Sequence, residues 1–384
     1  MFLLRAGLPL AVALLTSALL LVGCDTSVPA FPGTDAPLVP DDSQIESMEV
    51  PTGFDYATAA PVDLRVEALT RDAQPMASVR FDVYAGDLLL GSGLTDQTGR
   101  YAARYAVPAG TGALSVRTDY LGLPAALDAV IAGNEATVRF GGEAPSGART
   151  PLPLPSSLLR GAGAQTLVYL SPFDELGVPT ELVDPADIVD QRVLDAVNAA
   201  LPERQSVPEN NPQFLGDDVA HALDLLQDAD VWVTFVHEGA GFKNALGFYT
   251  YDLDAPPASP DAIDELRVVF PNTSYGGSGG GLFPGDKVRL GRFEAGTGIG
   301  FFIVPNGWRG DRVEPRTEQE LLFSNPDFNP EADPALRQHT VLLEVPNRDE
   351  ILLAFEDIER DRPNCDQDFN DVVFYVTADP ADAF

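Results

Sequence analysis

Basic residues are scarce in this sequence. The 384 residues include 24 lysines and arginines against 58 aspartates and glutamates, which gives a formal net charge of −34. Nucleic-acid binding depends on neutralising phosphates with basic side chains, so this composition excludes DNA and RNA as partners. Only Lys243 and Lys287 are lysines. A salt-loving host, surroundings rich in divalent cations and a GC-rich genome would each account for this bias, and all three interpretations stay open.

Cysteines and uninterrupted helical stretches are lacking as well. With 2 cysteines the chain has no disulfide framework, so its stability must come from a buried core, with or without bound metal. The 34 glycines and 33 prolines are spread along the chain and leave few windows for a long helix, which favours β-structure. A hydrophobic content of 45% excludes disorder of the whole chain, and the length predicts two or three domains.

The first residues have the pattern of a bacterial export signal. Arg5 precedes an apolar run that ends at Cys24, and small residues before this cysteine resemble the lipobox of bacterial lipoproteins, in which the cysteine is acylated. The alternative is a transmembrane anchor, but Pro9 interrupts the run and no positive cluster follows. We therefore expect residues 1–23 to be a lipoprotein signal peptide. The mature protein would be exported to the cell envelope, at the outer membrane or cell surface, and Cys365 would have no intramolecular partner.

Composition divides the remaining chain into four segments. Residues 24–60 are rich in proline and acid and predict an extended tether. Residues 61–142 form a first folded module, residues 143–160 a second proline-rich linker, and residues 161–384 a larger C-terminal module. The predicted fold class is mainly β, with tandem β-sandwiches of which the C-terminal one is jelly-roll-like and carries one helix.

The first module shows short segments of alternating polarity. Residues 62–68, 79–84 and 101–105 alternate apolar and polar side chains, which predicts half-buried antiparallel strands. Residues 95–101 (TDQTGRY) place an Asp/Gly turn between two strands. This stretch resembles the hairpin of carboxypeptidase-regulatory-like and similar immunoglobulin-like modules, and the resemblance implies a β-sandwich that acts as a spacer.

The C-terminal module contains one predicted helix among many predicted strands. Residues 186–201 repeat apolar side chains at helical spacing and stop at Pro202, which predicts a helix. A first strand is expected at residues 166–170. The eight further predicted strands are residues 231–236, 245–251, 266–270, 287–293, 300–304, 340–344, 351–355 and 372–377.

An acidic stretch near the C-terminus has the spacing of a cation-binding loop. Asp366, Asp368 and Asn370 stand at alternate positions, as do the first three ligands of an EF-hand, which favours Ca²⁺. The stretch is not an EF-hand, because the sixth position is Asp371 rather than Gly and the twelfth is Thr377 rather than Glu. Ligands from elsewhere must then complete the shell, and the candidates that end the preceding strand are Glu356 and Asp357.

Electrostatics favours a bound cation over an empty loop. Carboxylates brought within several Å of one another repel by roughly 1 kcal/mol per pair even in water, and a divalent cation reverses that cost. The alternative is a solvated acidic turn with Arg360 and Arg362 as partial counter-ions. Asn244, which precedes a predicted strand, is a secondary candidate ligand, although asparagine at such a position is more often a turn former.

Seven segments of the C-terminal module form a recognisable pattern: residues 231–241, 244–249, 276–282, 300–302, 337–340, 355–358 and 366–373. Together they resemble a known family, domain of unknown function 4114, over about residues 230–378. The resemblance implies a β-sandwich of exported bacterial proteins, often surface or adhesin-like, with Ca²⁺ at a D-x-D-F-N-D signature and no enzymatic activity.

Two enzymatic patterns are weak. Ser278 lies in a glycine run that satisfies the nucleophile-elbow pattern, and His339 follows it in the order of a hydrolase triad, but a turn rather than a helix leaves the serine. The only other histidines, His221 and His237, form no close pair with His339, so a zinc site is not expected.

These observations lead to three ranked hypotheses. The first is a non-enzymatic, lipid-anchored envelope protein whose Ca²⁺-stabilised β-sandwich binds a peptide, a glycan or a neighbouring surface protein, as adhesins do. The second is a structural envelope lipoprotein without a discrete ligand. The third is an extracellular hydrolase that uses Ser278 and His339.

Overall fold

A computed structural model describes residues 58–384, except 143–148, 154–157, 160–165, 217, 240, 317–320 and 347. The chain divides into two units, Met1–Tyr56 and Ala57–Phe384. The predicted signal peptide, Cys24 and nearly all of the predicted tether lie outside the described residues, as does most of the predicted linker. None of the helices among the described residues is both long and apolar enough to cross a bilayer.

Seven strands build the first β-module, and alternation explains their burial. Along β1, Val62, Leu64 and Val66 are buried while the residues between them are more exposed, as expected for a half-buried strand. The strands follow the order β3-β2-β5-β6-β7-β1-β4, in which β1 and β7 run parallel and the other pairs antiparallel. Their bounds are β1 (Ala59–Leu69), β2 (Arg80–Ala85), β3 (Leu88–Leu94), β4 (Arg100–Pro108), β5 (Ala113–Arg117), β6 (Ala126–Ala132) and β7 (Glu135–Gly141).

The Asp/Gly turn of this module is present, but its flanking strands do not form a hairpin. Asp96 Oδ1 accepts hydrogen bonds from the Thr98 amide and hydroxyl, and Gly99 takes a positive φ of 72°. However, β3 and β4 stand at opposite ends of the strand order and are not hydrogen-bonded neighbours. The expected hairpin is therefore wrong, because β4 pairs with β1 and β3 with β2.

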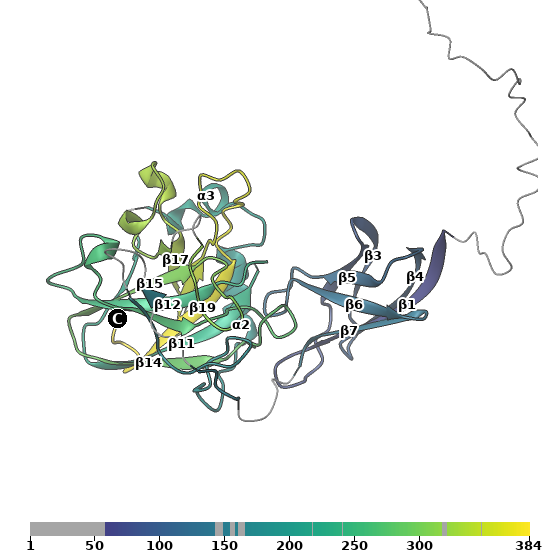
Figure 1. Cartoon of the computed structure of the whole chain (residues 1–384), viewed down its shortest axis with the longest axis horizontal. Helices are drawn as coiled ribbons and strands as arrows, with labels where there is room; N and C mark the ends of the chain where they lie inside the picture. The colour runs from purple at the N-terminus through teal and green to yellow at the C-terminus, as the bar shows by residue number, and fades with distance from the viewer. Residues whose placement is uncertain are drawn as a thin grey trace, which may run out of the picture. The chain divides into compact units, whose positions relative to one another are not determined.

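Two sheets form the C-terminal module (Figure 1). One has the order β10-β15-β12-β13-β9-β8 with β16 against β15, and the other has the order β14-β11-β19-β18-β17. The mainly β prediction is confirmed, and each strand predicted for this module is present. The bounds are β8 (Leu158–Leu159), β9 (Thr166–Tyr169), β10 (Leu223–Asp224), β11 (Ala229–Glu238), β12 (Ala245–Asp252), β13 (Leu266–Phe270), β14 (Lys287–Phe293), β15 (Thr297–Val304), β16 (Leu322–Phe323), β17 (Thr340–Glu344), β18 (Ile351–Phe355) and β19 (Val372–Asp379).

The main helix, α2 (Gln191–Ala200), begins later than residue 186, the predicted start. Asp190 caps it, because its side chain accepts hydrogen bonds from the amides of Arg192 and Val193. The short helices that follow or interrupt the strands are α3 (Val207–Asn210), η1 (Pro212–Phe214), η2 (Pro260–Ala262), η3 (Pro326–Phe328) and η4 (Pro334–Leu336).

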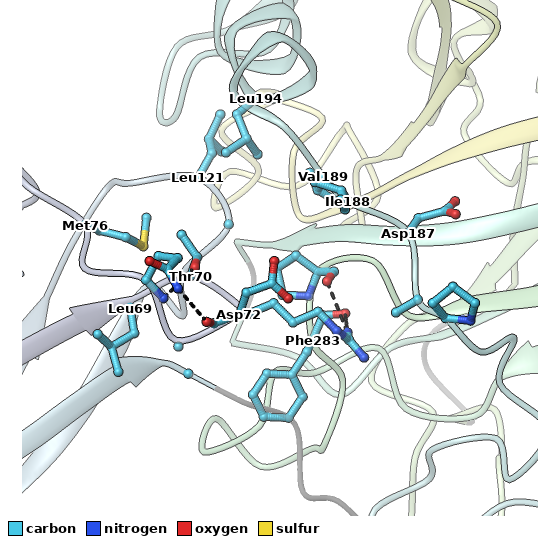
Figure 2. Close-up of a pocket in the computed structure, with 18 of the residues that line it drawn as sticks. Leu69, Thr70, Asp72, Met76, Leu121, Asp187, Ile188, Val189, Leu194 and Phe283 are labelled. Carbon is cyan, nitrogen blue, oxygen red and sulfur yellow. Dashed lines mark hydrogen bonds between the residues drawn. The ribbon is translucent and has the colours of Figure 1, made fainter.

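Within the Ala57–Phe384 unit, Arg71 reaches from the loop after β1 to the loop before β14. Its guanidinium lies 2.8 Å from the carboxylate of Asp286 and donates to the carbonyls of Phe283 and Pro284. Beside this contact lies a cavity of about 480 Å³ with a mostly apolar wall that includes Leu121 and Leu194 (Figure 2).

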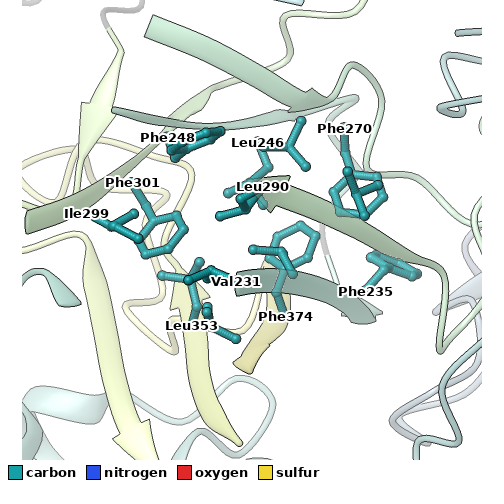
Figure 3. Close-up of a cluster of buried hydrophobic side chains, with 14 of the residues drawn as sticks. Val231, Phe235, Leu246, Phe248, Phe270, Leu290, Ile299, Phe301, Leu353 and Phe374 are labelled. Atoms are coloured by element: carbon teal, nitrogen blue, oxygen red, sulfur yellow. The ribbon is translucent and has the colours of Figure 1, made fainter. Parts of the chain in front are cut away.

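The main core lies between the two sheets of the C-terminal module. Phe235 and Phe374 come from one sheet and Phe248, Phe270 and Phe301 from the other, and all five are fully buried (Figure 3). The rings of Phe270 and Phe374 stack at 5.6 Å across the interface. A second core lies on the outer face of the β11–β19 sheet, where α2 covers it. The core therefore fixes the ends of β18 and β19, from which the candidate site extends.

Candidate metal centre

The predicted acidic residues meet where β18 ends and β19 begins. Phe355 and Val372 are paired across the ladder, so the residues that follow β18 and precede β19 are neighbours. One oxygen each of Glu356, Asp368 and Asp371 lies within 4.8 Å of the other two. The sequence prediction that the loop returns beside Glu356 thus agrees with the geometry.

The loop is wrapped tightly around Asp368. Its Oδ2 accepts from the amide of Arg204 at 2.8 Å and its Oδ1 from the amide of Asn370 at 3.2 Å. Gln367 and Phe369, on either side, both take positive φ values near 60°, which is costly for residues other than glycine. Phe369 is fully buried and anchors this strained turn. The loop is therefore preorganised, with its carboxylates held by backbone amides.

Burial makes the charged forms of these carboxylates unfavourable. It raises the pKa of Glu356 to about 8, that of Asp357 to about 7 and that of Asp368 to about 6, and neighbouring negative charges add to each shift. The same causes raise the pKa of Asp371. None of the ion pairs among the described residues involves any of these four groups. A cation would supply the missing positive charge.

Glu356 has an oxygen without a protein partner. The residue is 1% exposed, and its Oε2 is buried with no hydrogen bond among the described residues. Buried polar atoms are almost always satisfied, so an orphaned carboxylate oxygen inside an acidic cluster indicates a missing ligand. The free thiol of Cys365 lies beside Glu356, and burial raises the pKa of that thiol.

Asn244, predicted as a secondary ligand, contacts the carboxylate of Asp357. Its amide nitrogen donates to Asp357 Oδ2 at 2.6 Å, and its carbonyl oxygen accepts from the amide of Asn306 at 2.8 Å. The fully buried Asn244 therefore orients the carboxylate of Asp357, and its role as a ligand stays a prediction.

Asp366 and Asn370, which were also predicted as ligands, differ in burial. Asp366 is exposed, and its charge raises the pKa values of Glu356 and Asp357 without its oxygens joining the cluster. Asn370 is buried and donates to the carbonyl of Leu201 at 3.1 Å. Its side-chain oxygen lies 2.9 Å from where a Cβ on Gly239 would stand, so this position requires glycine.

Two glutamates near the site were not predicted. Burial raises the pKa of Glu203 to about 7, with Asp368 adding to the shift, and that of Glu238 to about 8, with Asp357 adding to it. Both lie more than a hundred residues away in sequence, after α2 and at the end of β11. No local spacing could have identified them.

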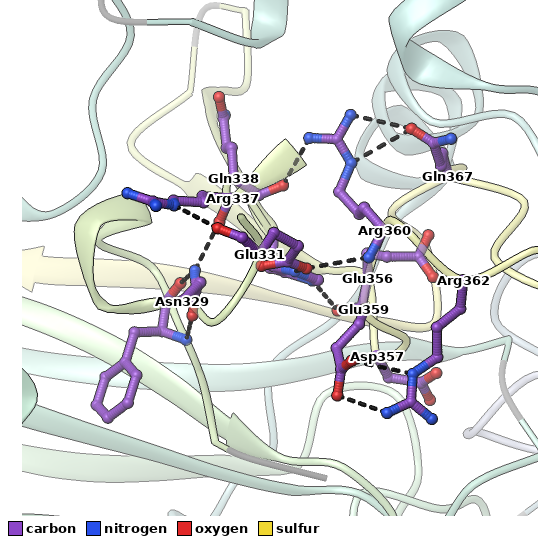
Figure 4. Close-up of polar contacts among 12 residues, drawn as sticks. Asn329, Glu331, Arg337, Gln338, Glu356, Asp357, Glu359, Arg360, Arg362 and Gln367 are labelled. Atoms are coloured by element: carbon purple, nitrogen blue, oxygen red, sulfur yellow. Dashed lines mark hydrogen bonds and ion pairs between the residues drawn. The ribbon is translucent and has the colours of Figure 1, made fainter. Parts of the chain in front are cut away.

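A buried polar network supports the start of the loop (Figure 4). His339 Nε2 lies 2.5 Å from Glu331 Oε1, and its Nδ1 lies 3.2 Å from the carbonyl oxygen of Glu356. Burial is the largest single influence on the pKa of Glu331 and raises it, but the interactions with His339 and the backbone hydrogen bonds together outweigh burial and lower the pKa. The Arg360 amide donates to the same Glu331 oxygen at 3.0 Å. The network thus ties the backbone on both sides of Asp357 to a rigid interior.

The arginines offered as counter-ions and the histidine offered as a catalyst all have hydrogen-bond partners, and Arg360 also interacts electrostatically with Glu356. Arg360 directs its guanidinium to Gln367 and to backbone carbonyls, and Arg362 pairs with Glu359 at 2.7 Å. The two ring nitrogens of His339 contact Glu331 and Glu356, and no contact with Ser278 is present among the described residues.

Comparisons with known proteins cover parts of the chain. A family described as Domain of unknown function (DUF4114) matches residues 293–379, which include the acidic loop but not β11 or β12. A second family, Domain of unknown function (DUF8469), matches residues 60–140. The resemblance of this module to immunoglobulin-like spacers stays a prediction.

No curated protein matches the chain. Among solved structures, a 9R-lipoxygenase from Cyanothece PCC8801 is 12% identical over 73% of this chain and 45% of its own, with a TM-score of 0.16. This chain spans less than half of that enzyme's length, and so low a score carries no argument about fold or activity.

Proposed function

We propose that this chain is a non-enzymatic, lipid-anchored protein of the bacterial cell envelope whose C-terminal β-sandwich binds Ca²⁺ and, through this stabilised module, a surface ligand. The observation that carries the metal assignment is the convergence of Glu356, Asp368 and Asp371, together with the buried Glu356 Oε2, which has no hydrogen-bond partner in the described part of the chain. Attachment to the membrane is inferred from the sequence around Cys24.

The donor set favours Ca²⁺ over other common ions. The site offers carboxylate oxygens and no cysteine or histidine ligand, which selects a hard cation. The donors come from an irregular loop and a strand end, and such a set suits the flexible coordination of Ca²⁺ better than the strict octahedron of Mg²⁺. Glu356, Asp368 and Asp371 would hold the ion, while Asn244 and the Glu331–His339 pair orient the residues around it.

The test is thermal unfolding of the full chain in detergent with Ca²⁺, with Mg²⁺ and with a chelator. At about 100 times its dissociation constant, Ca²⁺ should stabilise the folded state by roughly 2.7 kcal/mol, and Mg²⁺ by much less. Asp368→Asn should remove most of this response. The control is Asp361→Asn, which removes an equal charge from an exposed position of the same loop. This variant should keep the full stabilisation by Ca²⁺. Identical curves with Ca²⁺ and chelator in the unmutated chain would overturn the assignment.

The second candidate is a structural envelope lipoprotein without a discrete ligand. The high acidic charge supports this role, since a surface of net charge −34 binds counter-ions and resists association without any pocket. The two candidates differ in whether the C-terminal module has a cavity that binds a ligand.

A further inference from the structure

The outer face of the β14-β11-β19-β18-β17 sheet is only half covered. At one end α2 packs on it, so that Val193 and Val197 share a buried cluster with Val373 (Figure 1). Beyond the helix the face carries Trp232 and Thr377, which are paired across β11 and β19 and are half-buried. An open cavity of about 630 Å³ lies there, bounded by residues 187–192 at the start of α2 and by residues 348–350, which precede β18.

The charges around this cavity balance. Its lining contains three anionic and three cationic side chains, although the chain as a whole carries a charge of −34. This local neutrality disfavours an ionic ligand and favours a neutral, polar one. The six are Asp187, Asp349, Glu350, Arg192, Lys287 and Arg348.

Most of these groups are held in place by one another. Asp187 accepts from Tyr375 at 3.0 Å and from Thr234 at 2.8 Å, and Lys287 lies 3.0 Å from it. Arg348 bridges to Asp190 at 2.7 Å and also pairs with Glu350. The lining is thus preorganised, which lowers the cost of binding.

Two side chains in the lining, those of Arg192 and Trp232, are accessible to a ligand. The Arg192 guanidinium has no hydrogen-bond or ion-pair partner among the described residues. Trp232 is half-buried, with Lys287 Nζ 5.4 Å from its ring centroid, so the indole is fixed and still reachable. The flat indole can stack against the C–H face of a sugar ring, which is apolar. Carboxylate and guanidinium groups each offer two hydrogen-bonding atoms side by side, which suits two neighbouring hydroxyls of the same ring.

From this arrangement we infer that the cavity binds one or two rings of a neutral saccharide, stacked on Trp232 with hydroxyls toward Arg192 and Asp349. The inference rests on the proposed function, since it names the ligand class of the binding module. A peptide that adds a strand requires an open sheet edge, whereas this cavity lies on the face of the sheet over its central strands. The balanced charge also gives a free phosphate or a nucleotide no net attraction.

The test uses the full chain in detergent with saturating Ca²⁺, titrated with cellobiose, maltose and N,N′-diacetylchitobiose. The chain has 2 tryptophans and Trp308 is buried, so a saturable fluorescence change reports on Trp232. Calorimetry should show binding at least about tenfold weaker in Trp232→Ala and within about threefold of the unmutated chain in Trp232→Phe, which keeps a ring. Tyr84→Ala is the control, because Tyr84 is another half-buried strand aromatic under a cation, Arg117, in the other module.

Three results would overturn the inference: no saturable binding of any of the three sugars, equal affinity in Trp232→Ala, or binding of a neutral tripeptide in their place. The titration is repeated with chelator to separate the two proposals. Sugar binding without any effect of Ca²⁺ on unfolding would remove the metal assignment alone. Ca²⁺ stabilisation without sugar binding would remove the saccharide alone.

Discussion

The amide of Asp357 donates to Asp371 Oδ2 at 2.8 Å, so the loop between β18 and β19 closes on itself at the site. This bond uses one oxygen of Asp371 and leaves the other available to the cluster. It also aligns the two strand ends, since Phe355 and Val372 are paired just beyond it. The acidic centre is therefore continuous with the sheet. Binding of a cation there should raise the free energy of unfolding of the whole module.

Glu356→Gln should change stability in opposite directions with and without Ca²⁺. In chelator the substitution removes one of several buried, mutually repelling carboxylates and should raise the free energy of unfolding by about 1 kcal/mol. With Ca²⁺ it removes a ligand, and the metal-dependent gain should be lost. Denaturant unfolding under both conditions measures the two effects. The control is Glu344→Gln, at an exposed strand end, which should show neither the gain in chelator nor the loss with Ca²⁺. Equal changes in the free energy of unfolding with Ca²⁺ and with chelator in Glu356→Gln would contradict the prediction.

Most of the strands could be predicted from sequence, because alternating polarity is a local signal. Residues 266–270, 340–344 and 351–355 are strands with the predicted bounds. The start of α2 was not predictable in the same way. Residues 186–190 continue the helical periodicity, but the side chain of Asp190 bonds the amides two and three positions on and begins the helix there.

The site could be predicted only where its residues are close in sequence. Asp368 and Asp371 belong to one motif, and Glu356 precedes it by a single loop. Glu203 and Glu238 reach the same region through tertiary packing, which no spacing encodes. Asn244 was identified as a residue of the site, but its orientation toward Asp357 depends on Asn306, sixty-two positions away.

Cys24→Ser should release the protein from the membrane. Without the thiol no lipid is attached, and a chain with a net charge of −34 is repelled by an anionic surface. Fractionation of cells that express each form measures the change, with Cys365→Ser as the matched control that should stay in the membrane fraction. Retention of Cys24→Ser at the level of the unmutated chain would refute the lipoprotein assignment.

Arg71→Ala should destabilise the Ala57–Phe384 unit by about 2 kcal/mol. Asp286 is 1% exposed, and burial raises its pKa while Arg71 opposes that shift, so the substitution leaves a buried carboxylate without its partner. Arg65→Ala is the control, because Arg65 and Glu135 form an exposed pair at 3.6 Å whose loss should cost well under about 1 kcal/mol. Chemical denaturation measures the free energy of unfolding of both variants. Equal losses in Arg71→Ala and Arg65→Ala would show that the buried ion pair stabilises the fold no more than the exposed one.

Acid should weaken the fold through His237. Its Nδ1 accepts a hydrogen bond from the Gly122 amide at 3.2 Å and lies 2.9 Å from the Tyr275 hydroxyl oxygen, so the folded state needs this nitrogen unprotonated. Burial lowers the pKa of His237 to about 3. In the unfolded chain the pKa is about 6.5, so between these values the unfolded state binds a proton that the folded state does not. The free energy of unfolding must therefore fall as the pH drops through this window.

The effect of His237 is isolated by comparison with His237→Gln, which keeps an acceptor but does not titrate. Between pH 6.5 and pH 5 the unmutated chain should lose about 2 kcal/mol relative to the variant, at about 1.4 kcal/mol for each pH unit. Both proteins are measured with saturating Ca²⁺, so that changes common to the two cancel in the difference. A constant difference across this range would mean that folding does not lower the pKa of His237, and it would contradict the prediction.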